Sequence, residues 1–207
     1  GYGGQAQKWP QTVYPDSDPR MVGDEPVLLA RQSGCPVVVA PRRIVAVQSL
    51  LESCNLIISD DGLQHLSLGR DLELVVIDAQ RGLGNGHCLP VGPLREPADR
   101  LHSVDYIFAN GAADIAACSA VFNAVPGNPA AELLLPAKNV TSQAQPMTLQ
   151  PVQWRQPATV QCFAITERPF DESVKAVAGI GHPERFFSSL RELGLTVEGQ
   201  SFADHHS

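Results

Sequence analysis

The chain has 207 residues, enough for one ordinary domain or one domain with a small second lobe, which excludes a many-domain protein. Hydrophobic residues make up 43% and charged residues 18%, a composition typical of a globular protein and not of a disordered or fibrous one. The net charge of −7 argues against a broad polyanion-binding surface, so we expect no nucleic-acid partner.

The cysteines and the ends of the chain suggest where such a protein works. The five cysteines are scattered, odd in number and never in a CxxC pair, which predicts reduced thiols. The apolar runs are too short to span a bilayer, and we expect no signal peptide. Because the sequence starts at Gly1 without an initiator Met and ends in polar, histidine-rich residues, we expect it to be a fragment.

Short β-branched runs alternate with helical stretches in the first half of the chain. An acidic start at Asp24, an early Pro26 and a terminal Gly34 predict a helix over residues 27–32. The expected elements that follow are a strand over 36–40, a helix over 42–53, and strands over 56–59, 72–78 and 106–109. This alternation predicts β-α-β units with a buried parallel sheet.

The periodicity weakens from Gly111 to Phe170 and then returns. We therefore expect a core α/β segment over residues 1–110, a less regular subdomain or connection over 111–170, and a strand-helix-strand segment over 171–207. Its expected elements are a strand over 174–180, a helix over 185–193 and a strand over 195–202. The predicted fold class is α/β, with an open twisted, mostly parallel sheet and a smaller second subdomain.

One apolar run ends in two carboxylates. Residues 56–59 lead directly into Asp60 and Asp61, the form of a Walker B strand that delivers a carboxylate to a magnesium ion. Apolar strands also often end in an aspartate that only caps the next turn, and that alternative stays open here. The matching phosphate loop, GxxxxGK[ST], does not occur in the sequence, and none of the three lysines follows a glycine.

Other polar clusters allow both a structural and a functional interpretation. Asp24 and Glu25 stand where the helix dipole favours acids, and the pair Arg95 and Arg100 suits either an anion or surface ion pairs. The run 204–206, Asp-His-His, suits a metal patch, an acid/base pair or a solvated end. The glycine-rich run 82–87 lacks the third glycine of a dinucleotide fingerprint, so a tight turn is expected.

Several segments taken together resemble one family, the tetraacyldisaccharide 4′-kinases of lipid A biosynthesis. The segments, in chain order, are Gly1-Tyr-Gly-Gly, Val22-Gly-Asp-Glu-Pro, Asp60-Asp-Gly-Leu-Gln-His, Arg70-Asp-Leu-Glu, Arg81-Gly-Leu-Gly-Asn-Gly, Leu89-Pro-Val-Gly-Pro-Leu-Arg-Glu-Pro, Ala178-Gly-Ile-Gly-His-Pro-Glu-Arg-Phe-Phe and Phe202-Ala-Asp-His. They extend from the first residue almost to the last.

The resemblance implies a P-loop-NTPase-like kinase that uses ATP and Mg²⁺. Its substrate would be the 4′-hydroxyl of a tetraacylated glucosamine disaccharide 1-phosphate, and its product lipid IV-A, at the cytoplasmic face of the bacterial inner membrane. In the family, a Walker A loop and an N-terminal membrane-associating helix precede the GYGG motif. We therefore expect both to lie upstream of residue 1, and a final C-terminal stretch to be missing as well.

The resemblance also implies roles for individual residues. Asp60 and Asp61 fall on the family's Walker B acids that organise magnesium, Asp24 on its proposed base, and His205 on the histidine that pairs with that base. The weaker candidates for binding the disaccharide or its 1-phosphate are Glu25, Gln64, His65, Asn85, Arg95 and Glu96.

Two rival functions remain open from the sequence. One is a magnesium-dependent hydrolase that uses Asp60, Asp61 and His205 without ATP. The other is a truncated sugar-phosphate-binding module that lacks the nucleotide site. Because the phosphate loop is not in the sequence, we expect the 207-residue chain alone to be inactive as a kinase.

Overall fold

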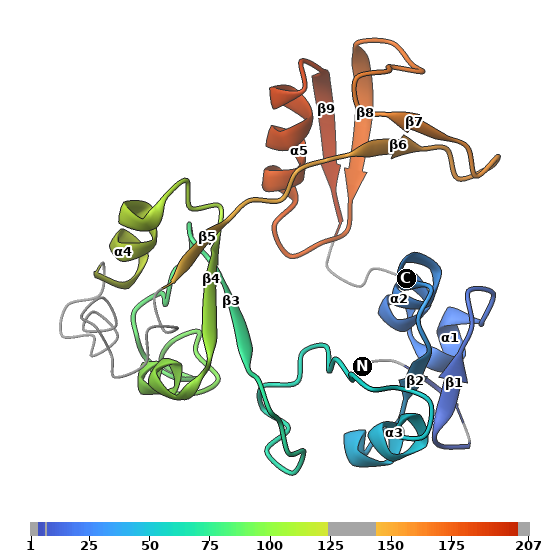
Figure 1. Ribbon diagram of the computed structural model, residues 1–207. Coiled ribbons are helices and arrows are strands. Elements are labelled where there is room, and N and C mark those ends of the chain that lie inside the picture. Colours follow the sequence, from blue (N-terminus) through green and yellow to red (C-terminus); the bar gives the residue numbers. More distant parts are fainter. Residues whose placement is uncertain (1–3, 7, 124–143, 203–207) are drawn as a thin grey trace. The chain divides into compact units, whose positions relative to one another are not determined.

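The computed structural model describes residues 4–6, 8–123 and 144–202, and it divides into two compact units, Gly1–Thr148 and Leu149–Ser207 (Figure 1). Within the described residues the regular elements are helical or extended in roughly equal measure, so the mixed α/β class is confirmed. The division falls after Thr148, whereas the sequence led us to expect changes near residues 110 and 170. Residues 124–143 lie outside the described part, so those finer boundaries stay a prediction.

The first unit begins with a two-stranded sheet and three helices. Strand β1 (Gln11–Val13) pairs antiparallel with β2 (Val37–Val39), and α1 (Pro19–Val22) and α2 (Asp24–Ser33) connect them. Helix α3 (Arg43–Leu50) follows β2. The apolar side chains of this layer bury one another; they are Val13, Val22, Val27 and Ala30, with Val37 and Val39 packed against them. The predicted helix over 27–32, strand over 36–40 and helix over 42–53 are confirmed.

Helix α2 ends where its sequence signals place the end, and it begins three residues earlier than expected. Gly23, with a φ of 94°, precedes the helix, and Gly34, with a φ of 64°, closes it in the left-handed region. Glycine enters that region without a steric penalty, which explains why the chain can turn sharply at both ends. This places Asp24 and Glu25 in the first turn of α2.

A parallel sheet of three strands is the second sheet of this unit. Strands β3 (Leu74–Asp78), β4 (Tyr106–Asn110) and β5 (Gln145–Met147) lie in that order, with Leu74 opposite Tyr106 and Asp78 opposite Asn110. The 3₁₀ helix η1 (Ala98–Ser103) precedes β4, and α4 (Ile115–Asn123) follows it. The predicted strands over 72–78 and 106–109 are confirmed.

The core beneath this sheet is tightly closed. Ile107 is 1% exposed, and Ala109 and Cys118 are 0% exposed. Burial raises the pKa of the Cys118 thiol, and the nearby Asp114 carboxylate adds to the rise. All five cysteines are free thiols. Cys118 therefore behaves as a small apolar core residue.

The strand expected over residues 56–59 is not present. These residues are extended but belong to no sheet, and Leu56 and Ile58 are 76% and 85% exposed. An apolar β-branched run forms a strand only when a neighbouring strand completes its hydrogen bonds and covers its side chains. Within the described residues, no strand takes that place, so the prediction from local composition was wrong.

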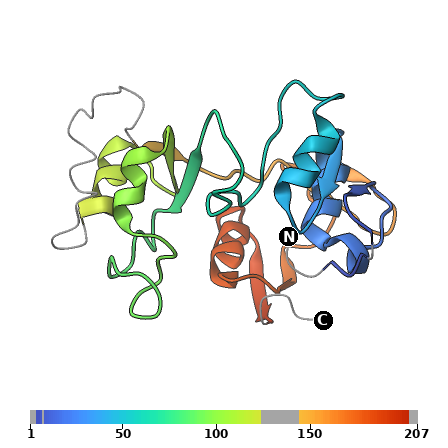
Figure 2. The ribbon, with the colours of Figure 1, turned by 90° about the horizontal axis from the view of Figure 1, so that it is seen from below.

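The second unit holds two small sheets. Strands β6 (Gln153–Arg155) and β7 (Cys162–Ala164) form an antiparallel pair. Strands β8 (Ser173–Ala178) and β9 (Thr196–Ser201) are parallel and joined by α5 (Pro183–Glu192), which lies alongside β9 in both views (Figure 1, Figure 2). Helix α5 buries Phe187 and Leu190 against Ala176, Ala178 and Leu195. This β-α-β segment is the one predicted over residues 171–207.

The parallel pairs of the two units are flanked by helices, as the fold class predicts. The described residues form four separate sheets instead of the single open sheet we expected. Strand β1 pairs only with β2, β6 only with β7, and β8 only with β9. Of the helices in the described part of the chain, none is both long and apolar enough to cross a bilayer.

Candidate functional site

Asp60 and Asp61 open a tight turn that follows the extended segment 56–59. Asp61 adopts a φ of 47°, in the left-handed region that aspartate tolerates better than most residues. The His65 amide donates to the Gly62 carbonyl at 3.0 Å and closes the turn. Both aspartates are exposed, so their carboxylates are available to a ligand.

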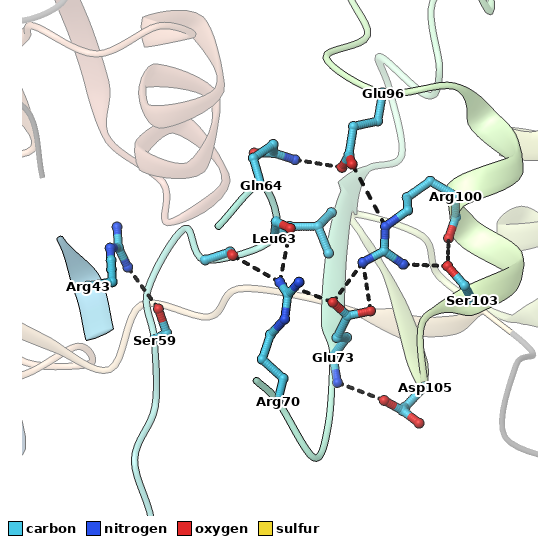
Figure 3. A network of polar contacts seen from close by, with 11 residues as sticks. Arg43, Ser59, Leu63, Gln64, Arg70, Glu73, Glu96, Arg100, Ser103 and Asp105 are labelled. Carbon is cyan, nitrogen blue, oxygen red and sulfur yellow. Dashed lines mark hydrogen bonds and ion pairs between the residues drawn. The ribbon is translucent and has the colours of Figure 1, made fainter. Parts of the chain in front are cut away.

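Arg43 holds the near side of this turn. It lies in the first turn of α3, and its Nη1 donates to the Ser59 hydroxyl at 2.9 Å (Figure 3). The same nitrogen donates to the Asp60 carbonyl. The guanidinium thus fixes the backbone immediately before the two carboxylates. The sequence gives no sign of this role of Arg43, because an arginine at a helix start carries no signal of a partner 17 residues away.

Four of the predicted site residues form a chain of contacts on the far side of the turn. Arg95 Nη1 lies 3.7 Å from Asp61 Oδ2 and donates to Gln64 Oε1 at 3.5 Å. Gln64 Nε2 in turn donates to Glu96 Oε2 at 2.9 Å (Figure 3). The Asp60–His65 turn and the Arg95–Glu96 pair, more than 30 residues apart in sequence, therefore meet at one place.

A cleft of about 620 Å³ lies beside the turn. One wall is apolar and comes from α2, β2 and α3, including Leu29, Val37, Val39, Val47 and Leu50. The polar residues that line it include Glu25, Asp60, Asp61, Gln64, His65 and Arg95. Six of the ten predicted site residues thus line one cleft, whose two kinds of surface suit an amphipathic ligand with an anionic or hydroxylated end.

The carboxylates fit a magnesium ion that is shared with a phosphate ligand. Among the described residues no cluster of three or more His, Cys, Asp or Glu side chains is arranged to hold a metal. Mg²⁺ is usually bound through one or two carboxylates, with phosphate oxygens and water completing its shell. Asp60 and Asp61 match that donor set, whereas a self-contained protein metal centre does not fit this site.

Asp24 occupies the first turn of α2, as expected, but its contact is local. Its Oδ1 accepts from the Glu25 amide at 3.0 Å, which is the behaviour of a residue that satisfies the free amides of a helix start. Asp24 is exposed. Its neighbour Glu25 lines the cleft. His205 lies outside the described residues, so the pairing of Asp24 with His205 stays a prediction.

Asn85 is engaged within its own loop. Its Nδ2 donates to the Val91 carbonyl at 3.0 Å, and its Oδ1 accepts from the His87 amide at 3.2 Å. Gly92 passes so close that a Cβ there would overlap both Asn85 Oδ1 and the His87 carbonyl. The two motifs of this loop therefore fold against each other, and a role of Asn85 in substrate binding stays a prediction.

Three further charged residues stand behind the turn: Arg70, Glu73 and Arg100. Arg100 places Nη2 at 2.7 and 2.8 Å from the two carboxylate oxygens of Glu73, so the ion-pair interpretation of Arg100 applies. In the sequence, Arg70 and Glu73 stand out only as the two ends of the segment Arg70-Asp-Leu-Glu, which by itself indicates no role for them.

Comparison with known proteins gives a single family. The family model described as Tetraacyldisaccharide-1-P 4′-kinase matches residues 1–207. The tetraacyldisaccharide 4′-kinase of Alkalilimnicola ehrlichii is 49% identical over 207 residues, which is 100% of this chain and 54% of that protein. The enzymes of the same name from Nitrosococcus oceani and Hahella chejuensis are 46% and 44% identical, over 100% of this chain and 53% and 54% of theirs.

The chain spans about half the length of these relatives. No solved structure matched the chain.

Proposed function

The chain belongs to the tetraacyldisaccharide-1-phosphate 4′-kinase family, and on that premise we propose that the whole protein transfers the γ-phosphate of ATP to the 4′-hydroxyl of a tetraacylated glucosamine disaccharide 1-phosphate. The product is lipid IV-A. The observation that carries the proposal on this chain is the cleft in which Asp60, Asp61 and Arg95 stand at the edge of an apolar wall.

The two halves of the cleft suit the two halves of such a substrate. The apolar wall of α2, β2 and α3 gives acyl chains a surface to cover. Gln64 and His65 offer hydrogen bonds to sugar hydroxyls, and the exposed Arg95 guanidinium suits a phosphate because its fork matches two phosphate oxygens.

Phosphoryl transfer depends on positioning and on neutralising negative charge. Bound ATP with Mg²⁺ supplies the phosphoryl group and much of that neutralisation. In this chain Asp60 and Asp61 would hold the ion, and Arg95, 3.7 Å from Asp61, keeps the two adjacent carboxylates from repelling an incoming phosphate. Asp24 is our candidate for accepting the hydroxyl proton, with His205 orienting its carboxylate.

We assign the remaining parts of the mechanism to the half of the relatives that this chain does not cover. We assign to that part the phosphate-binding Walker A loop of a P-loop-NTPase-like fold and a peripheral contact with the cytoplasmic face of the inner membrane. The parallel order of β3, β4 and β5 supports such a fold, because P-loop-NTPase-like proteins are built on a parallel sheet flanked by helices.

The test is a transfer assay on a full-length kinase that carries this chain. With labelled ATP, Mg²⁺ and the tetraacylated disaccharide 1-phosphate, we expect the label on the lipid and a mass gain of one phosphate group at the 4′ position. Hydrolysis of the lipid with Mg²⁺ in a parallel reaction without ATP, and no transfer of label, would identify the hydrolase instead. Saturable lipid binding without any transfer, in the full-length protein, would identify the binding module.

A further inference from the structure

Glu73 is a partly buried carboxylate in the polar network around the site. It stands directly before β3, and its side chain is 14% exposed. Its Oε1 lies 3.0 Å from Arg70 Nη1 and 2.7 Å from Arg100 Nη2, and both arginine side chains are about one-fifth exposed (Figure 3). One carboxylate thus balances two partly buried guanidinium groups, which solvent screens only weakly.

The first of these arginines reaches the turn that carries Asp60 and Asp61. Arg70 Nη1 donates to the carbonyls of Gly62 at 3.0 Å and of Leu63 at 2.9 Å. These carbonyls belong to the two residues that follow Asp61. Glu73 therefore fixes the guanidinium that fixes the backbone of the turn.

The second arginine reaches the same turn through side chains. Arg100 Nε lies 3.8 Å from Glu96 Oε1, and Glu96 Oε2 accepts from Gln64 Nε2 at 2.9 Å. Gln64 is itself part of the turn and also accepts from Arg95. The contacts form a closed ring from Glu73 through Arg70, the turn, Gln64, Glu96 and Arg100 back to Glu73.

The sheet holds Glu73 itself in place. Its backbone amide donates to Asp105 Oδ2 at 2.8 Å, and its carbonyl accepts from the amides of Asp105 and Tyr106 at 3.1 Å. Tyr106 is the first residue of β4. The ring is therefore anchored where β3 and β4 begin to pair.

We propose that Glu73 is a positioning residue, which holds the turn bearing Asp60 and Asp61 to the β3–β4 sheet through Arg70 on one side and Arg100 on the other. Its effect on magnesium rests on the proposed function, whereas its effect on the turn does not. Loss of its charge removes the carboxylate partner of Arg70 and leaves Arg100 with Glu96, at 3.8 Å, so both attachments of the turn weaken.

The first experiment measures the turn in the 207-residue chain by amide hydrogen exchange. In Glu73→Gln we expect the peptide over residues 60–68 to exchange about 10-fold faster, because the amides of His65 and Leu68 are bonded within this turn. The segment β8–α5–β9 should exchange as in the wild type. Asp99→Asn is the matched control, since it removes one exposed carboxylate beside Arg100 and should leave the peptide unchanged.

Unchanged exchange over residues 60–68 in a folded Glu73→Gln chain would overturn the proposal. A uniform rise over the whole first unit would also overturn it, because that pattern indicates general destabilisation. If Glu73→Gln does not fold, Arg70→Met decides. Methionine keeps the apolar stem but removes the guanidinium whose Nη1 reaches both carbonyls and Glu73, so the same local rise is expected, and its absence contradicts the proposal.

The second experiment measures magnesium dependence in the full-length kinase. Changing residues that orient metal ligands typically costs about 10- to 100-fold in metal affinity or activity. We expect Glu73→Gln to raise the half-saturating Mg²⁺ concentration by about 10-fold and to recover part of its kcat at high Mg²⁺. A fall in kcat with an unchanged Mg²⁺ requirement contradicts the proposal. A wild-type enzyme without transfer activity contradicts only the proposed function, and the exchange experiment then still decides.

Discussion

Two segments of the first unit have nearly the same sequence but differ in secondary structure. Residues 56–60 read Leu-Ile-Ile-Ser-Asp, and residues 74–78 read Leu-Val-Val-Ile-Asp. The second segment is strand β3, paired residue by residue with β4. The first is extended but unpaired within the described residues, and its Leu56 and Ile58 are largely exposed. Local composition is similar in the two segments, so the presence of a neighbouring strand decides which one becomes a strand.

The aspartates that end the two segments also differ. Asp78 Oδ1 accepts from the amides of Gln80 at 2.9 Å and Arg81 at 3.3 Å, so it organises the turn after β3. Asp60 and Asp61 instead line the cleft, with their backbone held by Arg43 and Arg70 and the Asp61 carboxylate beside Arg95. Asp78 thus caps the turn after its strand. Asp60 and Asp61 remain our candidates for binding a ligand.

The largest expected effect separates these aspartates by turnover. In the full-length kinase, Asp60→Asn and Asp61→Asn should each lower kcat by about 10²- to 10³-fold, the usual loss when one group that stabilises transition-state charge is removed. Asp78→Asn, the matched control, should leave kcat near the wild-type value because asparagine keeps the accepting oxygen of the turn. Equal losses from Asp78→Asn and Asp61→Asn, measured in the same transfer assay, would remove the distinction between the two segments.

The loop that follows β3 gives the next largest effect. Gly92→Ala should destabilise the first unit by about 1–3 kcal/mol, because its Cβ would overlap Asn85 Oδ1 and the His87 carbonyl. Gly69→Ala is the matched control, since no atom lies within 4 Å of a Cβ built there. Denaturant unfolding of both variants measures the difference. A wild-type midpoint for Gly92→Ala would show that Asn85 does not hold this loop closed.

A matched pair of isoleucines tests the pairing itself. Ile77 lies in β3 and is 8% exposed, so Ile77→Val should lower the free energy of unfolding by about 0.5–1.5 kcal/mol. Ile58, 85% exposed in the unpaired segment, should change by less than about 0.5 kcal/mol in Ile58→Val. Urea unfolding of the 207-residue chain gives both values. Equal losses at the two positions would mean that residues 56–59 are buried after all.

The smallest expected effect concerns the exposed partner of Asp61. The side chains of Arg95 and Asp61 are 58% and 61% exposed, so Arg95→Gln should change stability by no more than about 0.5 kcal/mol. Arg100→Gln makes the same chemical change at a guanidinium that is 20% exposed and bound to both oxygens of Glu73, and it should cost clearly more. Similar unfolding midpoints for the two variants would contradict the assignment of Arg95 to ligand binding and Arg100 to structure.

Most regular elements could be predicted from the sequence because their signals are local. The helix α2 has an acidic first turn and a closing Gly34, and α5 opens with Pro183, so both were expected close to their observed bounds. The short strands β1, β5, β6 and β7 were not expected. Each has three residues, too few for any alternation to stand out, and each depends on pairing with a distant segment.

The candidate site could be predicted only in part, for a similar reason. The Walker B pattern gave Asp61, the charged pair gave Arg95, and the resemblance to a family added Gln64 and Glu96. The structure brings these four residues into contact. Spacing alone could not supply Arg43 or Glu73, because their partners are set by the tertiary fold. The exposed Asp24 shows the opposite case, since its local contact fits a helix start and its proposed partner His205 lies beyond the described residues.

The central claim is that Asp60 and Asp61, and not the similar Asp78, hold the magnesium ion of the phosphoryl transfer. Pulsed electron paramagnetic resonance tests it directly in the full-length kinase, with Mn²⁺ in place of Mg²⁺, a non-hydrolysable ATP analogue and aspartate labelled with ¹³C at the carboxylate. We predict a carboxylate coupling to Mn²⁺ that persists in Asp78→Asn and weakens or disappears in Asp60→Asn, in Asp61→Asn or in both. A coupling that survives in the double variant Asp60→Asn, Asp61→Asn, or that is lost in Asp78→Asn, would contradict the claim.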